Sequence, residues 1–544
     1  MRARLLLMLA AYAAIAVWLT WPLARRATTD LPNPAGAFRQ VDILSAAWLL
    51  AWHTHALTTD PALLPSPNAF HPTPHALFYA PPALGPLPLF APVYAASGSA
   101  SLAYAVAFLA GLALAALGVA EVVRRWTRCV PAAFLAGLAL LASPTIRTSA
   151  GTAPLCAMLV GLPWIVYGGA QRPLGAGGAA VLVGALVLQS LVDPIFATLG
   201  ALVPLGLVAA ARIARASARR DGWRLVACIG IACALTSPLS LGYLVAWRGL
   251  DPAHPGPWSA PIAALLESVK DLPAPSLPSI AIGTQPAGVW YGVGIVALGA
   301  LLAWRRGGLA EPGWRHAALW AGLGFVLGVP TIAYAVALGR PEILDRLGPL
   351  RSLQRLSTDL LAGGPLLVGL AIAELYRRVD AFAGGSALAR RALTAAALVV
   401  MLAELAPRAP YETLPAPSLP PSLRTAIART GGPVLELPVG QPPFEAAAMY
   451  RSIGEWWPLV NGYASFWPRG FAERMDAARR LPDRDALQTL VDETGLRAVV
   501  VTLRALPPAS RAAWSGSDGP ARAGLRRIAE EGGQIAFAVD LGDG

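Results

Sequence analysis

Long apolar runs separated by clusters of arginine are the feature of this sequence that most constrains its fold. A helix that crosses the roughly 30 Å hydrocarbon core of a bilayer needs about 20 predominantly apolar residues. About eleven runs approach this length, near residues 5–24, 100–123, 130–146, 152–170, 176–192, 194–211, 224–247, 287–304, 315–338, 356–376 and 391–407. The pattern predicts an α-helical polytopic membrane protein.

The composition excludes a chain that folds only in water. Hydrophobic residues make up 56% of the sequence and charged residues 14%, with a mean hydropathy of +0.54, whereas charged residues are about a quarter of a soluble domain. The formal net charge of +12 comes from arginines that lie between apolar runs. Nucleic-acid binding requires basic residues gathered on one face, so the expected partner is membrane lipid and not nucleic acid.

The positions of the arginine clusters predict the topology. The clusters occur at every second junction between apolar runs, and lysine and arginine concentrate in cytoplasmic loops. We therefore expect a cytoplasmic N-terminus. The long loops near residues 25–99, 248–286 and 339–355, together with the chain after about residue 408, then lie on the outer side.

The fifth and sixth apolar runs are separated only by Asp193 and Pro194. A proline cannot continue the hydrogen bonding of a helix interior. The two runs could therefore form a broken or re-entrant pair, and Asp193 at their junction is a lesser candidate for function.

The sequence changes character near residue 407, which divides the chain into a polytopic domain at 1–407 and an extracytoplasmic domain at 408–544. A proline-rich linker up to Pro421 is followed by charged sequence. Strands are predicted at 433–438, 497–503 and 534–541, and helices at 483–494 and 521–531. The alternation of strands and helices predicts a small C-terminal α/β domain.

Asp42 is the principal candidate for catalysis. It precedes an amphipathic stretch, residues 43–57, in the long first outer loop. One interpretation is structural, since aspartate is a preferred N-cap residue. The other is functional: the carboxylate could act as a general base, or hold a divalent cation such as Mg²⁺ or Mn²⁺ at a phosphate leaving group.

The same stretch supplies two candidates for substrate binding, Trp52 and His53. Trp48, Trp52 and His55 recur at helical spacing, which is typical of a helix that lies in the membrane interface. His53 is eleven residues beyond Asp42, roughly 16 Å along a helix with a rise of 1.5 Å per residue. The two side chains cannot form a hydrogen-bonded pair within one helix.

Arg351 and Arg355 are the candidates for contact with a phosphate. They lie where the third outer loop returns to the membrane, four residues apart, and so on one face of a helix. Two convergent guanidinium groups could bind phosphate through bidentate hydrogen bonds. The alternative is an interfacial pair whose charged ends extend to water.

Several segments resemble the GT-C superfamily of membrane glycosyltransferases, in particular a bacterial subgroup. They are TWPL at 20–23, Asp42, the two tryptophans Trp48 and Trp52, DPALLPSPNAFHP at 60–72, and MYRSIGEWWPLVNGYASFWP at 449–468. The order of the long first outer loop, many spans and an outer C-terminal domain is also similar. Many members carry two acidic residues in a DxD or ExD pattern in the first loop, whereas Gln40 and Val41 precede a single Asp42 here.

The resemblance implies transfer of a sugar from a polyprenyl-phosphate donor to a glycan, lipid or protein acceptor at the outer face of the bacterial cytoplasmic membrane. Asp42 would be the catalytic carboxylate, and Arg351 or Arg355 would meet the carrier phosphate. The only cofactor expected is a divalent cation held by Asp42. Because the first loop carries one acidic residue here in place of two, dependence on a metal stays open. Two other functions stay open: a transporter or flippase of an envelope glycolipid, and a non-catalytic scaffold that binds glycan.

Overall fold

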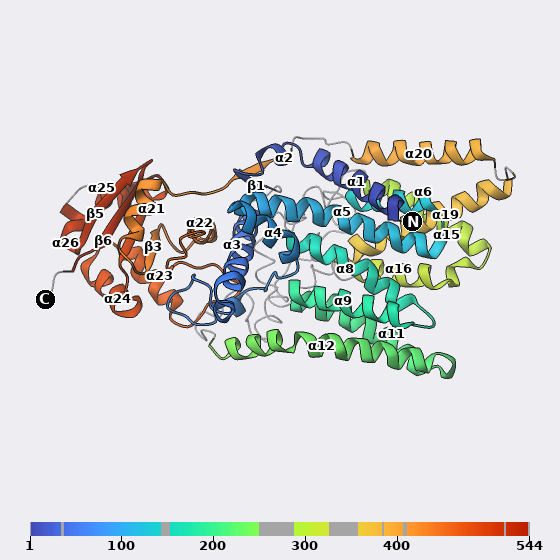
Figure 1. The fold of residues 1–544 in the computed structure, drawn as a ribbon, viewed down its shortest axis with the longest axis horizontal. Coiled ribbons are helices and arrows are strands. Elements are labelled where there is room, and N and C mark those ends of the chain that lie inside the picture. Colours follow the sequence, from blue (N-terminus) through green and yellow to red (C-terminus); the bar gives the residue numbers. More distant parts are fainter. Residues whose placement is uncertain are drawn as a thin grey trace, which may run out of the picture.

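The computed structural model describes residues 2–33, 37–142, 153–249, 288–325, 357–382, 384, 386–405, 411–515 and 518–541. A bundle of roughly parallel helices occupies most of the chain, and a smaller part built around a sheet lies beyond one end of it (Figure 1). The bundle helices are α1 (Arg2–Leu19), α5 (Ala100–Thr127), α6 (Val130–Ala142), α8 (Ala153–Ala170), α9 (Ala176–Val192), α11 (Val203–Ile213), α12 (Arg219–Trp247), α15 (Gly288–Arg305), α16 (Pro312–Leu323), α19 (Ser357–Phe382) and α20 (Ala387–Leu405).

Most of these helices begin and end within about six residues of an apolar run. Helix α11 begins at Val203, after the break in the run at 194–211, and the runs at 130–146 and 315–338 extend beyond the described residues. By length and hydropathy, two helices in the described ranges, 100–127 and 216–246, could cross a membrane. Several other apolar helices contain 10–17 residues. The predicted number of about eleven spans therefore stays a prediction.

Helix α5 lies at the centre of the bundle, in contact with α1, α6, α8 and α19. Small residues allow this close packing, as is usual where helices associate in a membrane. A Cβ atom at Gly137 of α6 would lie 2.3 Å from the hydroxyl oxygen of Tyr12 on α1. That hydroxyl donates a hydrogen bond to the carbonyl of Phe134 at 2.9 Å, so α1 and α6 are held together through a glycine.

The break predicted between the fifth and sixth runs is present. Helix α9 ends at Val192, α10 (Pro194–Phe196) begins at Pro194, and a π-helical stretch (Ala197–Leu202) follows before α11. The carboxylate of Asp193 accepts a hydrogen bond from the backbone amide of Phe196 at 3.1 Å. This contact satisfies one of the unpaired amides at the start of α10.

The first loop contains two helices that lie across the end of the bundle, α3 (Ala37–Thr59) and α4 (Leu87–Ser97) (Figure 1). Helix α3 begins five residues before Asp42. The prediction that Asp42 caps the helix N-terminus is therefore wrong. The polar residues before position 42 continue the helix, and the carboxylate projects from its second turn.

The C-terminal part contains a four-stranded sheet in the order β3-β4-β6-β5. Strands β3 (Val434–Leu437) and β4 (Ala498–Thr502) are parallel, while β6 (Gln534–Val539) runs antiparallel to β4 and to β5 (Leu525–Glu531). The helices of this part are α21 (Pro421–Ala428), α22 (Pro442–Arg451), α23 (Phe471–Arg480), α24 (Arg484–Thr494), α25 (Pro508–Ser515) and α26 (Asp518–Ala523).

The helix predicted at 521–531 is wrong, because α26 ends at Ala523 and the following residues form β5. Gly532 and Gly533 both adopt positive φ angles and make the two-residue turn into β6. Such turns favour glycine because they require left-handed backbone. Among the described residues, strand β5 pairs with β6 alone, so most of its polar residues remain exposed at the edge of the sheet.

Candidate functional site

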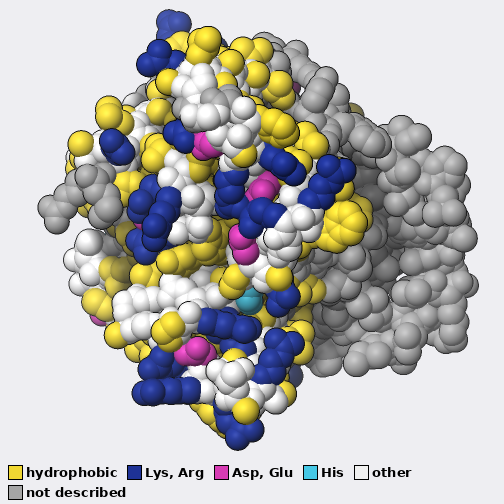
Figure 2. Space-filling view, turned by 90° about the vertical axis from the view of Figure 1, so that its right-hand side faces the viewer, with side chains coloured by type: hydrophobic (Ala, Val, Ile, Leu, Met, Phe, Trp, Pro, Cys, Tyr) yellow, Lys and Arg dark blue, Asp and Glu magenta, His cyan; other side chains and the backbone are white. Residues whose placement is uncertain are grey.

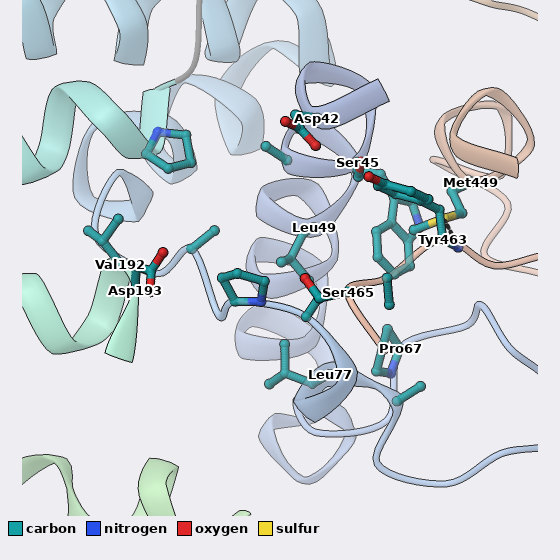
Figure 3. Close-up of a pocket in the computed structure, with 18 of the residues that line it drawn as sticks. Asp42, Ser45, Leu49, Pro67, Leu77, Val192, Asp193, Met449, Tyr463 and Ser465 are labelled. Atoms are coloured by element: carbon teal, nitrogen blue, oxygen red, sulfur yellow. Dashed lines mark hydrogen bonds between the residues drawn. The ribbon is translucent and has the colours of Figure 1, made fainter. Parts of the chain in front are cut away.

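A cavity of about 350 Å³ lies where the first loop, the bundle and the C-terminal part meet (Figure 3). Helix α3 contributes one wall and the α9–α10 break contributes the opposite one. The labelled lining residues are Asp42, Ser45 and Leu49 of α3, Pro67 and Leu77 of the first loop, Val192 and Asp193 at the break, and Met449, Tyr463 and Ser465 of the C-terminal part. Residues more than 400 positions apart therefore form a single site.

The cavity combines two carboxylates with a mainly apolar lining. Asp42 is exposed on α3, and Asp193, which is buried, lies across the hollow beside Val192 (Figure 3). The hydroxyl groups of Ser45, Tyr463 and Ser465 add further polar atoms. Cavities of this kind, mostly apolar with a few convergent polar groups, are the usual form of small-molecule sites.

A continuous set of backbone hydrogen bonds fixes the first loop to the C-terminal sheet. On one side, segment 458–461 pairs with β3 through the amide of Val434 to the carbonyl of Pro458, 2.8 Å, and the amide of Val460 to the carbonyl of Val434, 2.9 Å. On its other side, Leu459 donates to the carbonyl of Asn68 at 2.7 Å and accepts from the amide of His71 at 2.9 Å. The segment acts as a strand between two partners.

The side chain of Asn68 adds a second connection between these parts. Its amide nitrogen donates to Ser452 Oγ at 3.0 Å and to the carbonyl of Trp457 at 2.9 Å. Its amide oxygen accepts from the indole nitrogen of Trp48 on α3 at 3.1 Å. Asn68 is buried, so these partners satisfy an amide that would be costly to bury alone.

Asn461 extends the pairing with β3 through its side chain. Its Oδ1 atom accepts from the amide of Glu436 at 2.7 Å, and its Nδ2 atom donates to the carbonyl of Glu436 at 2.9 Å. The carboxylate of Glu436 in turn pairs with Arg451, with 2.7 Å from Nε to Oε2. Burial raises the pKa of Glu436, and the adjacent guanidinium of Arg451 opposes that rise.

Glu445 of α22 holds the segment that enters the cavity. Its carboxylate accepts hydrogen bonds from the amide of Gly440 at 2.6 Å, from Asn461 Nδ2 at 3.0 Å and from the amide of Gly462 at 3.1 Å. Burial raises the pKa of Glu445 to about 7, although these three donors favour the ionised form. Gly462 leads directly into Tyr463 and Ser465 of the cavity wall.

Gly462 has a steric reason to be glycine. A Cβ atom there would lie 2.5 Å from the ring of Phe70, and Phe70 itself lines the cavity. The amide of Phe70 donates to the carbonyl of Asn461 at 3.0 Å. The backbone of the C-terminal part therefore lies directly against the first loop at this point.

Trp52 and His53 are buried in α3 and do not line the cavity. The ring of His53 hydrogen-bonds the carbonyl of Pro82 at 2.7 Å through Nε2, and burial lowers the pKa of His53 to about 4. Trp52 packs edge-on against Trp456, with ring centroids 5.4 Å apart. Trp52 therefore stabilises the junction between the first loop and the C-terminal part, and His53 stabilises the first loop itself.

Arg351 and Arg355, the predicted phosphate contacts, lie outside the described residues, and their role stays a prediction. Asp42 lines the cavity, and its catalytic role stays a prediction. Asp193, a lesser candidate from the sequence, also lines it, together with Ser45 and Ser465, which the sequence analysis did not select. The break between two apolar runs was the signal for Asp193, whereas the serines lie in segments whose pattern does not distinguish them.

The donor set fits a weakly held divalent cation. Within the described ranges, no three His, Cys, Asp or Glu side chains lie together as metal ligands. The cavity nevertheless presents two carboxylates, Asp42 and Asp193. Mg²⁺ is commonly bound by one or two carboxylates together with waters and substrate phosphate oxygens. Because Asp42 and Asp193 lie on opposite sides of the hollow, such an ion would be held by Asp42 with waters and phosphate oxygens.

No family model matches the chain, and no curated protein matches it. Among solved structures, it is similar over 98% of its length to 98% of ArnT from Cupriavidus metallidurans bound to undecaprenyl phosphate, with 14% identity and a TM-score of 0.43. It is also similar over 98% of its length to 73% of the Archaeoglobus fulgidus oligosaccharyltransferase in complex with Zn and sulfate, with 13% identity and a TM-score of 0.48.

A third similar structure is the oligosaccharyltransferase AglB from Archaeoglobus fulgidus with an inhibitory peptide and a dolichol-phosphate. The similarity covers 100% of this chain and 75% of that one, with 13% identity and a TM-score of 0.48. The three similarities have identities of 13–14%. At TM-scores below 0.5 they assign no residue, substrate or metal to this chain.

Proposed function

We propose that the protein is a membrane glycosyltransferase that transfers a sugar from a polyprenyl-phosphate donor to an acceptor in the cavity beside α3. The observation that carries this proposal is the placement of two carboxylates, Asp42 and Asp193, in one mainly apolar cavity. The resemblance of the first loop and of residues 449–468 to the GT-C superfamily supplies the reaction class.

In the proposed reaction, an acceptor hydroxyl oxygen attacks the anomeric carbon of the donor sugar. A new bond from carbon to the acceptor oxygen forms as the bond to the phosphate oxygen breaks, and the polyprenyl phosphate leaves with that electron pair. Asp42 takes the proton of the acceptor hydroxyl, the role of a general base. Attack opposite the leaving group inverts the configuration at the anomeric carbon.

Asp42 is the residue that would hold a divalent cation in this reaction. A bound cation neutralises charge that develops on the departing phosphate. The proposal does not depend on the cation, because Asp42 can accept the proton directly. The hydroxyl groups of Ser45, Tyr463 and Ser465 line the cavity, and we assign them the orientation of sugar hydroxyls.

The apolar lining suits the carrier end of the donor. Leu49, Leu77, Val192 and Met449 face the cavity, and apolar surface of this kind favours the first isoprene units over water. Arg351 and Arg355 are proposed to meet the carrier phosphate. We place the cavity and the C-terminal part on the outer side of the bacterial cytoplasmic membrane, opposite the arginine-rich turns.

The test is sugar transfer from a panel of polyprenyl-phosphate sugars by the purified chain, with Mg²⁺, with Mn²⁺ and with chelator. Wild type is compared with Asp42→Asn, Asp193→Asn and a control, Asp485→Asn, which changes an exposed carboxylate in α24. We expect turnover of at least one donor by wild type and the control, and its loss in Asp42→Asn. Equal turnover by wild type and Asp42→Asn would contradict the assignment, and no turnover of any donor by folded protein would favour a transporter or a scaffold.

A further inference from the structure

The end of the bundle opposite the cavity carries a dense group of arginines, which we call the basic end. It comprises residues 4, 121–128, 172, 212–224, 305–315 and 374–391, which are the first turn of α1 and the turns between successive helices. Figure 2 shows this end, with Lys and Arg side chains spread over the face that the structure describes and few Asp or Glu side chains among them. These segments contain seventeen arginines and five carboxylates.

This difference of twelve equals the formal net charge of +12 of the whole chain, so the remaining sequence is close to neutral. All five carboxylates are already held in ion pairs. Glu121 pairs with Arg124 at 2.6 Å, Glu374 with Arg377 at 2.6 Å, Asp380 with Arg390 at 2.5 Å, Glu311 with Arg306 at 2.7 Å and Asp221 with Arg224 at 3.4 Å. Within the described part of the chain, the other arginines of the basic end, Arg125 apart, form no ion pair.

Most of the unpaired guanidinium groups are exposed, including Arg128, Arg172, Arg305 and Arg315. The densest group is at the start of α12, where Arg215, Arg219 and Arg220 lie within six residues and are all exposed. Like charges at such spacing repel one another, and an external anion would relieve the repulsion.

Exposed aromatic residues beside these arginines indicate which kind of anion the basic end would bind. Trp223 follows Arg220 and is 58% exposed, and Trp304 precedes Arg305 and is 66% exposed. Large exposed indole rings next to arginines at the end of an apolar bundle are typical of the headgroup level of a bilayer. Non-specific binding of nucleic acid depends on charge. It would not explain the exposed tryptophans beside these arginines.

We propose that the basic end binds the phosphate groups of anionic phospholipids, with Arg215, Arg219 and Arg220 as its strongest contact. Each basic residue near such a leaflet adds to the attraction, which falls with ionic strength. Binding would fix the depth of the bundle relative to the headgroups. The proposal depends on the membrane setting and not on the transferase activity, so the failure of one would leave the other standing.

The test measures lipid retained by the full chain purified in neutral detergent, after incubation with equal amounts of phosphatidylglycerol and phosphatidylcholine at low salt. Retained lipid is quantified by native mass spectrometry. We expect wild type to retain several times more phosphatidylglycerol than phosphatidylcholine. The variant Arg215→Gln/Arg219→Gln/Arg220→Gln should retain at least threefold less phosphatidylglycerol with unchanged phosphatidylcholine, and 0.5 M salt should remove the preference in wild type.

The matched control is Arg429→Gln/Arg480→Gln/Arg484→Gln, which removes three exposed arginines of the C-terminal part. It should keep the wild-type preference. Equal retention of the two lipids by wild type, or an equal loss in the control, would overturn the proposal. Displacement of the bound lipid by a short RNA duplex at matched charge would assign the surface to polyanions in general and would also overturn it.

Discussion

At the cavity end of the bundle, polar side chains are buried and paired with partners that lie hundreds of residues away in the chain, whereas at the basic end they are exposed and belong to short turns. Asn68 illustrates the first arrangement, and Arg215 and Arg220 the second. Removing the partner of a buried polar group lowers the free energy of unfolding, whereas exposed charges contribute little to it. Substitutions at the cavity end should therefore be costly for activity and stability, and substitutions at the basic end should affect mainly the lipid surroundings.

The largest expected effect is on transfer by Asp42→Asn. An amide has nearly the same size as the carboxylate but cannot accept the acceptor proton, and general-base catalysis is typically worth about 10²–10⁴-fold in rate. We expect kcat to fall by at least 100-fold while the unfolding midpoint in detergent stays near that of wild type. A similar loss in Asp485→Asn would show that the effect does not arise in the cavity.

The second prediction concerns the pH dependence of stability in Glu445→Gln. The folded-state pKa of Glu445, about 7, lies above its ordinary value of 4.5. The protonated carboxyl group of Glu445 therefore stabilises the folded state fully below about pH 4.5, and this stabilisation is lost as the pH rises through about 7. The difference between the two pKa values corresponds to about 3 kcal/mol in the free energy of unfolding. Thermal unfolding followed by tryptophan fluorescence from pH 5 to 8 should show a weaker decline in Glu445→Gln than in wild type.

Glu455→Gln is the matched control for that experiment, because Glu455 is an exposed carboxylate a few residues beyond α22. Its stability should decline with pH as wild type does. Parallel curves for wild type and Glu445→Gln would mean that the buried carboxylate keeps an ordinary pKa.

The third prediction, of intermediate size, is that Gly462→Ala destabilises the junction between the first loop and the C-terminal part. The added methyl group would meet the ring of Phe70 at 2.5 Å, and overpacking of this kind typically costs about 1–3 kcal/mol. The unfolding midpoint should fall, and binding of a polyprenyl phosphate should weaken. Gly230→Ala in α12 is the control, because nothing lies within 4 Å of its added Cβ, and it should leave stability unchanged or slightly increased.

The smallest expected effect is that of Arg215→Gln on the protein in neutral detergent. Exposed charges away from specific contacts change stability by less than about 0.5 kcal/mol. We expect an unfolding midpoint within error of wild type when no anionic lipid is present. A fall in the unfolding midpoint as large as that of Gly462→Ala would contradict the expected difference between the cavity end and the basic end.

The helices of the bundle and three of the four strands of the C-terminal sheet were predicted from local pattern, because burial on one face imposes a period that short windows reveal. The strand β5 was missed because its residues, LRRIAEE, are mostly polar and fit a helical face as well as an exposed edge strand. The Gly532–Gly533 pair was the better signal, since two successive glycines favour a hairpin turn.

The candidate site could be predicted only where its residues stand out in their own segment. Asp42 was selected because it is an isolated acidic residue in a long loop, and Asp193 because it interrupts an apolar run. The contributions of Tyr463 and Ser465 arise from the pairing of segment 458–461 with the first loop. That pairing joins residues almost 400 positions apart, and no local period encodes it.

The strand-like segment at 458–461 also sets an order of events during synthesis. Asn68 leaves the ribosome 389 residues before its partner Trp457, an interval of roughly 20–80 s at 5–20 residues per second. Until then the backbone amides of Phe70 and His71 lack their acceptors at Asn461 and Leu459, and the cavity lacks one of its walls. A nascent or prematurely terminated chain would therefore present an incomplete cavity, and the site would be assembled only once residues 458–465 had been made.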